Sequence, residues 1–190
     1  MQKLHNYIEN INRLFVTGNA REHSYRGDLQ DLLNKIIDDK DIVVTNEPAR
    51  IVNVGAPDYS ITKKDIPIGY IEAKDIGVDL GSKTLKEQFD RYKASLSNII
   101  FTDYLDFHLY RDGQFVRKIA IGEINDKGTI QPLTENFDAF ALFIKDFCTH
   151  IGQTIKSSKT LAKMMAGKAR LLSQIIEKAL NSDEDNDEDS

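Results

Sequence analysis

Residues 55–74 read GAPDYSITKKDIPIGYIEAK and carry the strongest structural signal in the chain. Two segments of strand length, 58–61 and 68–74, lie within this stretch. Side chains alternate between the two faces of a strand, so Glu72 and Lys74 share one face of the second segment. This pair belongs either to a functional site or to an ordinary solvated ion pair on a surface hairpin.

A polar run at 63–67, which ends in proline, separates the two segments and is typical of a hairpin turn. If the strands pair symmetrically about Asp65, Asp58 lies directly opposite Glu72. Opposed side chains of an antiparallel pair are roughly 4.5–5.5 Å apart at Cβ, and two carboxylates there repel each other unless a cation neutralises them. The expected cation is Mg²⁺, which proteins hold through one or two carboxylates, water and substrate phosphate.

This arrangement predicts metal-assisted hydrolysis of a phosphodiester. A metal ion at Asp58 and Glu72 would polarise a phosphoryl oxygen, deliver a water as hydroxide and stabilise the leaving 3′ oxygen. Lys74 would add a positive charge beside the scissile phosphate. A preorganised cation directed at developing negative charge accelerates such reactions.

Several short motifs carry a resemblance to a known family. They are EHSYR at 22–26, NEP at 46–48, GAPD at 55–58, GYIEAKD at 69–75 and TDY at 102–104. The order of Pro57-Asp58 and Glu72-Ala73-Lys74 resembles the PD-(D/E)xK nuclease superfamily of restriction and repair enzymes. QFDRY at 88–92 fits the Q-x-x-x-Y element of many members. Over 22–110 the combination resembles the N-terminal nuclease domain of type IIG-like single-chain restriction–modification enzymes.

The resemblance implies a role for each matching residue. The metal ion, Mg²⁺ with Mn²⁺ as a substitute, would be held at Asp58, Glu72 and Ala73. The expected catalytic residues are Asp58, Glu72, Lys74, Gln88, Tyr92 and Glu22, and the expected DNA-binding residues are Arg26, Gln88 and Tyr92. The partner would be double-stranded DNA, with an adenine-N6 methyltransferase and a target-recognition domain in the same longer chain. Cleavage of both strands would use two copies, most simply as a transient dimer.

Gln88 and Tyr92 are four residues apart and face the same side of a helix expected at 83–94. Their family role is to orient the DNA backbone or the lysine. For Tyr92 the alternative is a core residue beside Phe89 and Leu96. Gln88 has the stronger functional case, because a glutamine that faces the core needs a hydrogen-bond partner.

Glu22 precedes an apolar stripe that follows the helical period as far as Ile37. The resemblance makes Glu22 an assistant of the metal site. The helix macrodipole by itself also favours an acidic residue in a first turn, so both interpretations stay open. Arg26, four residues later, is expected to contact phosphate.

The chain has 25 basic and 30 acidic residues, a net charge of −5, but six of the acids lie in 183–189. The remainder is nearly neutral, so we expect weak non-specific DNA affinity and delivery to DNA by another module. The single Cys148 cannot form an internal disulfide, and the scattered histidines disfavour a zinc site. No apolar run approaches the roughly 20 residues that span a bilayer, so a cytoplasmic protein is expected.

The expected fold class is α/β, with a central mixed β-sheet flanked by helices, as in restriction endonucleases, and a long C-terminal helix. Helices are expected at 2–15, up to 37 and at 83–94, and strands at 42–45, 50–54, 58–61, 68–74, 98–102, 106–111 and 115–120. The expected domains are a nuclease domain at 1–150, a helical connector at 151–182 and a disordered acidic tail at 183–190. The connector either packs on the nuclease core or docks on a methyltransferase.

The predicted function is that of a Mg²⁺-dependent DNA endonuclease domain of a restriction–modification enzyme, which leaves a 5′-phosphate and a 3′-hydroxyl. One alternative is a repair or recombination nuclease that acts on ends or branched DNA. Another is a catalytically silent nucleic-acid-binding module with the same fold.

Overall fold

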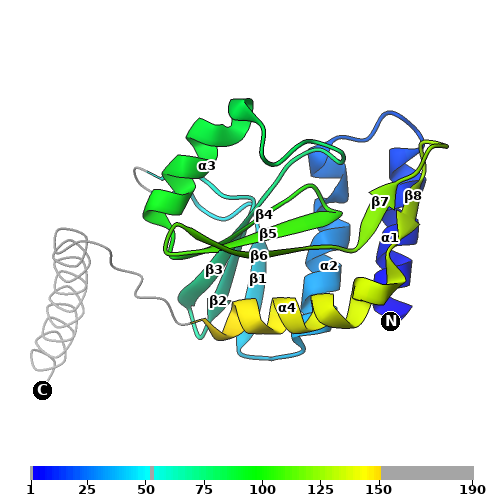
Figure 1. Ribbon diagram of the computed structural model, residues 1–190. Helices are drawn as coiled ribbons and strands as arrows, with labels where there is room; N and C mark the ends of the chain where they lie inside the picture. The colour runs from blue at the N-terminus through cyan, green and yellow to red at the C-terminus, as the bar shows by residue number, and fades with distance from the viewer. Residues whose placement is uncertain (1, 52–53, 151–190) are drawn as a thin grey trace, which may run out of the picture. The chain divides into compact units, whose positions relative to one another are not determined.

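The computed structural model describes residues 2–51 and 54–150 (Figure 1). The expected connector at 151–182 and the acidic tail at 183–190 lie outside the described residues. A six-stranded mixed sheet flanked by helices confirms the expected α/β class. Within 2–51 and 54–150, no helix is long and apolar enough to cross a membrane.

The helices and strands of the described residues have the following bounds. The helices are α1 (Gln2–Phe15), α2 (Arg26–Ile37), α3 (Lys83–Ser95) and α4 (Phe137–Thr149), with 3₁₀ turns at Glu22–Tyr25 and Thr134–Asn136. The strands are β1 (Ile42–Asn46), β2 (Tyr59–Lys63), β3 (Ile66–Ala73), β4 (Asn98–Thr102), β5 (Asp106–Arg111), β6 (Gln114–Ala120), β7 (Gly122–Ile124) and β8 (Ile130–Pro132). Strands β1 to β6 form the main sheet in sequence order, and only the β3–β4 pair, which α3 connects, is parallel.

The strand expected at 50–54 does not form at Arg50, Ile51 and Val54, and residues 52 and 53 lie outside the described residues. Ile51 and Gly55 instead form an isolated bridge, in which the Ile51 N–H donates to the Gly55 carbonyl (2.8 Å) and the Gly55 N–H donates back (3.1 Å). Gly55 has a φ of 127°, a region that favours glycine. Three of the five residues at 50–54 are β-branched, as in a strand, but among the described residues Ile51 pairs with Gly55 and not with a neighbouring strand.

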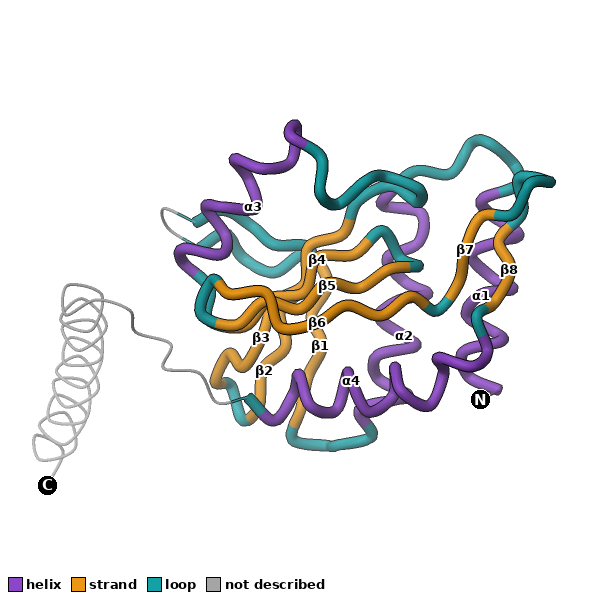
Figure 2. Tube along the Cα trace, in the orientation of Figure 1, coloured by secondary structure: helices purple, strands orange, loops and turns teal. Residues whose placement is uncertain are grey.

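The second half of the domain contains elements that the sequence patterns left unassigned. These are α4 and the small β7–β8 hairpin, which lies beside α1 (Figure 2). The strands expected at 106–111 and 115–120 are present as β5 and β6, and Asp112 and Gly113, both with positive φ, join them as an antiparallel hairpin.

The two faces of the main sheet are covered differently (Figure 1). Helices α1, α2 and α4 cover one face and share a continuous apolar core with it, whereas α3 covers the other face with a smaller cluster. The approach of α4 to β3 is close, because a Cβ added at Gly69 would overlap the Phe147 ring. Glycine at position 69 therefore allows the helix to seat on the strand.

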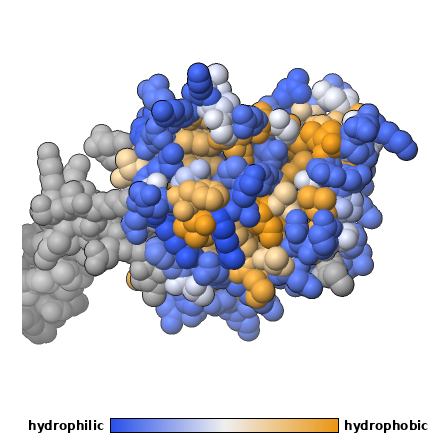
Figure 3. Space-filling view, viewed as in Figure 1, coloured by the Kyte–Doolittle hydropathy of each residue, from blue (hydrophilic) through white to orange (hydrophobic). Residues whose placement is uncertain are grey.

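The outer surface of β6 and α4 is partly apolar (Figure 3). Phe115 and Val116 on the edge strand β6 are exposed, as is Leu142 on α4. Arg117 and Lys118 follow the two apolar residues on the same strand, and charged side chains on an edge strand disfavour pairing with a further strand.

Candidate active site

The β2–β3 hairpin places Asp58 and Glu72 next to each other. Tyr59 pairs with Ile71 and Ser60 with Tyr70, and the same register extended by one residue sets Asp58 opposite Glu72, as the sequence predicts. Asp58 Oδ2 accepts a hydrogen bond from the Ala73 N–H at 2.7 Å. The register therefore brings both carboxylates to the same end of the hairpin.

The turn of this hairpin is tighter than the predicted loop at 63–67. Lys64 and Asp65 alone form it, both with positive φ, and the strands extend to Lys63 and Ile66. A register shift between Ile61 and Thr62 absorbs the difference. A bulge adds one residue to one strand, so the site end of the hairpin keeps its register although the turn differs.

Asp58 is buried, and Arg26 provides its counter-charge. The Arg26 guanidinium bonds to Asp58 Oδ1 and also to Glu22 Oε1 (3.0 Å) and Glu47 Oε1 (2.8 Å). Burial acts to lower the pKa of Arg26, but the charges of Asp58 and Glu22 outweigh burial and raise this pKa above its ordinary value. The guanidinium therefore stays charged. Arg26 is 7% exposed, so contact with a phosphate requires these ion pairs to rearrange. Its predicted DNA contact stays a prediction.

Glu72 is the most buried acid of the site, with 3% of its surface exposed. Its Oε1 accepts hydrogen bonds from Lys74 Nζ and from Gln88 Nε2, both at 2.6 Å. Its Oε2 is buried and has no hydrogen-bond partner among the described residues. Burial, and secondly the Asp58 charge, raises the pKa of Glu72 to about 7. An ionised Glu72 thus lacks one of the partners that a buried carboxylate requires.

Lys74 follows β3 directly and lies between two acids. Its Nζ is 2.6 Å from Glu72 Oε1 and 4.0 Å from Glu22 Oε2, and its side chain is 15% exposed. Burial acts to lower the pKa of Lys74, yet Glu72, Glu22 and Asp58 raise it overall. The ammonium group is therefore held charged on the same face as Glu72.

The donor set fits a hard divalent cation. Asp58, Glu72 and the backbone carbonyl of Ala73 would supply oxygen ligands, which Mg²⁺ prefers. The unpartnered Glu72 Oε2 is a buried carboxylate oxygen with free acceptor capacity. Across 2–51 and 54–150, no three Asp, Glu, His or Cys side chains gather as a metal-binding group. Any ion at this site would therefore take its remaining ligands from backbone, water or substrate.

The fold brings the predicted accessory residues to the same place. Gln88 of α3 binds Glu72, which is the partner that a core-facing glutamine needs. The Tyr92 ring is 3% exposed and packs in the cluster under α3, and its hydroxyl lies against Gly55. Glu22 contacts Arg26 and lies near Lys74. The catalytic and DNA-binding roles of these residues stay predictions.

Two residues of the site had no assigned role in the sequence analysis. Glu47 directly follows β1, has a φ of 51°, and extends a largely exposed carboxylate to Arg26. The Tyr104 hydroxyl donates to the Glu22 carbonyl at 2.7 Å and so fixes the start of the 3₁₀ turn. Both lie within the quoted motifs at 46–48 and 102–104, which was the available signal.

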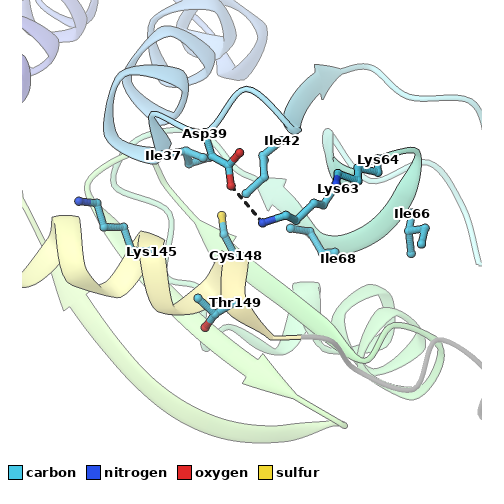
Figure 4. A pocket seen from close by; sticks show the side chains of 10 residues that line it. All are labelled: Ile37, Asp39, Ile42, Lys63, Lys64, Ile66, Ile68, Lys145, Cys148 and Thr149. Carbon is cyan, nitrogen blue, oxygen red and sulfur yellow. Dashed lines mark hydrogen bonds and ion pairs between the residues drawn. The ribbon is translucent and has the colours of Figure 1, made fainter.

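A cavity lies at the other end of the β2–β3 hairpin, away from the candidate site (Figure 4). It has a volume of about 530 Å³ and an apolar floor that includes Ile42, Ile68 and Cys148. Asp39 and Lys63 form an ion pair at its rim, 3.0 Å apart. None of the candidate site residues lines it, so the chemistry of the side chains identifies the site here, and cavity size does not.

Comparison with known proteins places the fold but names no family. No model of a protein family matches the sequence, and no curated protein matches it. Among solved structures, a chain of the cryo-EM structure of a DrdV–DNA complex is similar, with a TM-score of 0.59 and 20% sequence identity. The match covers 78% of this chain and 14% of that chain. At this identity the similarity shows the fold alone, and this chain spans a small part of the other protein's length.

Proposed function

We propose that this chain is a Mg²⁺-dependent DNA endonuclease domain of the PD-(D/E)xK type. One observation carries the proposal: a buried carboxylate, Glu72, opposes Asp58 on a hairpin, has an unpartnered oxygen, and shares its strand end with Lys74. Two buried carboxylates, one of them with an unpartnered oxygen, destabilise the folded state, so stability does not explain why they are there. Perturbed titratable groups of this kind mark functional sites.

The residues of the site divide the work between them. Asp58, Glu72 and the Ala73 carbonyl would hold the ion, which when bound polarises the phosphoryl group and activates water. Lys74 stabilises negative charge that develops on the phosphate. Gln88 fixes the orientation of the Glu72 carboxylate through its 2.6 Å hydrogen bond. The products are a 5′-phosphate and a 3′-hydroxyl.

The similarity to a chain of a DNA complex supports DNA as the substrate. The small share of that chain that is matched supports a nuclease module within a longer protein. We extend the proposal to a restriction–modification enzyme, in which an adenine-N6 methyltransferase and a target-recognition domain accompany this module. A transient dimer on DNA would supply the second active site for a double-strand break.

The test is digestion of supercoiled plasmid with Mg²⁺, with Mn²⁺ or with EDTA. The wild-type chain, Lys74→Ala and Lys63→Ala are compared, because Lys63 is a lysine of the same hairpin at its other end. We expect metal-dependent nicking by wild type and Lys63→Ala, and a loss of at least about 100-fold in Lys74→Ala. Equal nicking by Lys74→Ala and wild type would contradict the assignment. Progressive shortening of linear DNA would indicate an exonuclease of the repair type.

A second candidate is a DNA-binding module without catalysis. The observation that favours it is the contact of Arg26 with Asp58, because a guanidinium already neutralises one of the two carboxylates. DNA binding by the wild-type chain without nicking in either metal, including in the longest available form of the protein, would favour this candidate.

A further inference from the structure

A second, positively charged cavity lies beside the candidate active site. It has a volume of about 240 Å³ and is lined by Arg50, Val54, Gly55 and Arg91. Among the described residues, no acidic side chain lines this cavity, whereas the neighbouring site holds Asp58 and its acidic neighbours. The two arginines come from different parts of the chain, the loop before β2 and helix α3.

Arg91 is held in place by two contacts that leave its outer nitrogens available. Its Nε donates to the Val54 carbonyl at 3.1 Å, and its guanidinium lies 5.7 Å from the centre of the Tyr92 ring. Within the described part of the chain, the terminal nitrogens of Arg91 form no hydrogen bond or ion pair, and neither does Arg50. An arginine oriented in this way loses little side-chain entropy on binding an anion.

The loop that carries Arg50 is fixed on α3 at the same point. The Ile51–Gly55 bridge closes the loop, and a Cβ at Gly55 would lie 3.1 Å from the Tyr92 hydroxyl oxygen. Two guanidinium groups around one hollow repel each other, and an anion between them removes the repulsion. Phosphate suits this position, because guanidinium groups bind its oxygens in a bidentate manner.

The cavity is close enough to the carboxylates to serve the same substrate. Gly55 precedes Asp58 by three residues, which span at most about 11 Å of chain. On α3, Arg91 is three residues after Gln88, so the two side chains are neighbours on the helix, and Gln88 binds Glu72. A DNA strand with its scissile phosphate at the carboxylates would therefore pass the arginine pair with a neighbouring phosphate.

We infer that Arg50 and Arg91 form a binding subsite for a backbone phosphate of duplex DNA, next to the phosphate that is cleaved. This inference rests on the proposed nuclease function and assigns two residues outside the PD-(D/E)xK motif. The pair adds positive charge beside a centre in which four acids, Glu22, Glu47, Asp58 and Glu72, outnumber Arg26 and Lys74. It positions the strand without reading its sequence, since phosphate contacts carry no base information.

The test measures binding separately from cleavage. In a Lys74→Ala background with Mg²⁺, the affinity for a short fluorescein-labelled duplex is followed by anisotropy as the salt concentration is raised. The double variant Arg50→Ala/Arg91→Ala is compared with Arg13→Ala/Lys35→Ala, which removes the same charge from exposed positions of α1 and α2. Circular dichroism establishes that each variant is folded.

Two lost phosphate contacts reduce the slope of log affinity against log salt by about 1.8. Between about 50 and 200 mM salt, the affinity of the parent should therefore fall about tenfold more than that of Arg50→Ala/Arg91→Ala. The control variant should keep the slope of the parent. Equal slopes for all three proteins would overturn the inference, and so would a parent that binds no duplex at low salt.

The outcomes also separate this inference from the proposed function. A changed slope together with no nicking by the wild-type chain supports the phosphate subsite and contradicts hydrolysis. Metal-dependent nicking together with equal slopes supports the nuclease and contradicts the subsite.

Discussion

The two faces of the main sheet differ in the side chains that cover them, one being mainly apolar and the other carrying polar groups. On one face, α4 contributes six buried apolar residues to a continuous core with α1 and α2. On the other face, α3 buries only Phe89 and Tyr92, with Leu85 partly buried beside them. Glu72 lies on this second face, where Gln88 and Lys74 can reach it. Burying a carboxylate costs less free energy where polar partners and solvent are close, and the thinly covered face provides both.

Removing a large apolar side chain from the first face should produce the largest change in stability. Phe140 is fully buried, and Phe140→Ala should cost about 3–5 kcal/mol through lost burial and the remaining cavity. Leu142 on the same helix is 66% exposed, so Leu142→Ala should stay within about 0.5 kcal/mol of wild type. Urea denaturation measures both. Coinciding midpoints for the two variants would show that α4 is not anchored as described.

Neutralising Asp58 should destabilise the protein, because its charge partner is buried. The Arg26 side chain is 8% exposed, and Asp58→Asn leaves it short of one carboxylate. Breaking a buried pair in this way should cost about 2–4 kcal/mol, with Glu22 and Glu47 retaining part of the pairing. Thermal or urea unfolding near neutral pH tests this. An unchanged stability would mean that these two acids alone suffice for Arg26.

Neutralising Glu72 should have the opposite sign. Its pKa is about 7 in the folded chain, above its usual value, so the unfolded chain releases a proton that the folded chain retains between about pH 4.5 and 7. Wild-type stability therefore falls as pH rises through this range. Glu72→Gln should be more stable than wild type by about 1–3 kcal/mol at about pH 8, and by less at about pH 5.

Denaturation of Glu72→Gln and wild type at both pH values checks this sign. A loss of stability at both would show that the ion pair with Lys74 outweighs the cost of burial. In either case the variant should lose nicking activity, because the proposed ligand charge is gone. A stabilised but inactive variant would separate the function of Glu72 from any role in folding.

The smallest expected effect is that of removing the Tyr92 hydroxyl, which separates a core role of Tyr92 from its family role. Tyr92→Phe keeps the ring that packs under α3 and removes only the hydroxyl beside Gly55, so stability should change by less than about 1.5 kcal/mol. A core role predicts unchanged nicking, whereas the family role predicts slower nicking at equal stability. Parallel unfolding and plasmid assays decide between them.

The accuracy of the sequence analysis varied along the chain for physical reasons. Helix 2–15 was predicted with the bounds that the structure has, because its apolar stripe is regular. Segment 50–54 was predicted as a strand since local propensity does not show whether a partner strand exists. Helix α4 was not predicted, although six of its residues are buried.

Strand periodicity determined, from sequence alone, that Glu72 and Lys74 share a face. The predicted position of Asp58 opposite Glu72 is also found, but through a two-residue turn and a register shift between Ile61 and Thr62 that the sequence analysis did not foresee. These are local properties, set by neighbours along the chain. Only the tertiary structure decided that Arg26, 32 residues from Asp58, neutralises it. It also decided that burial raises the pKa of Glu72, because the environment of a charge depends on elements that meet only after the chain has folded.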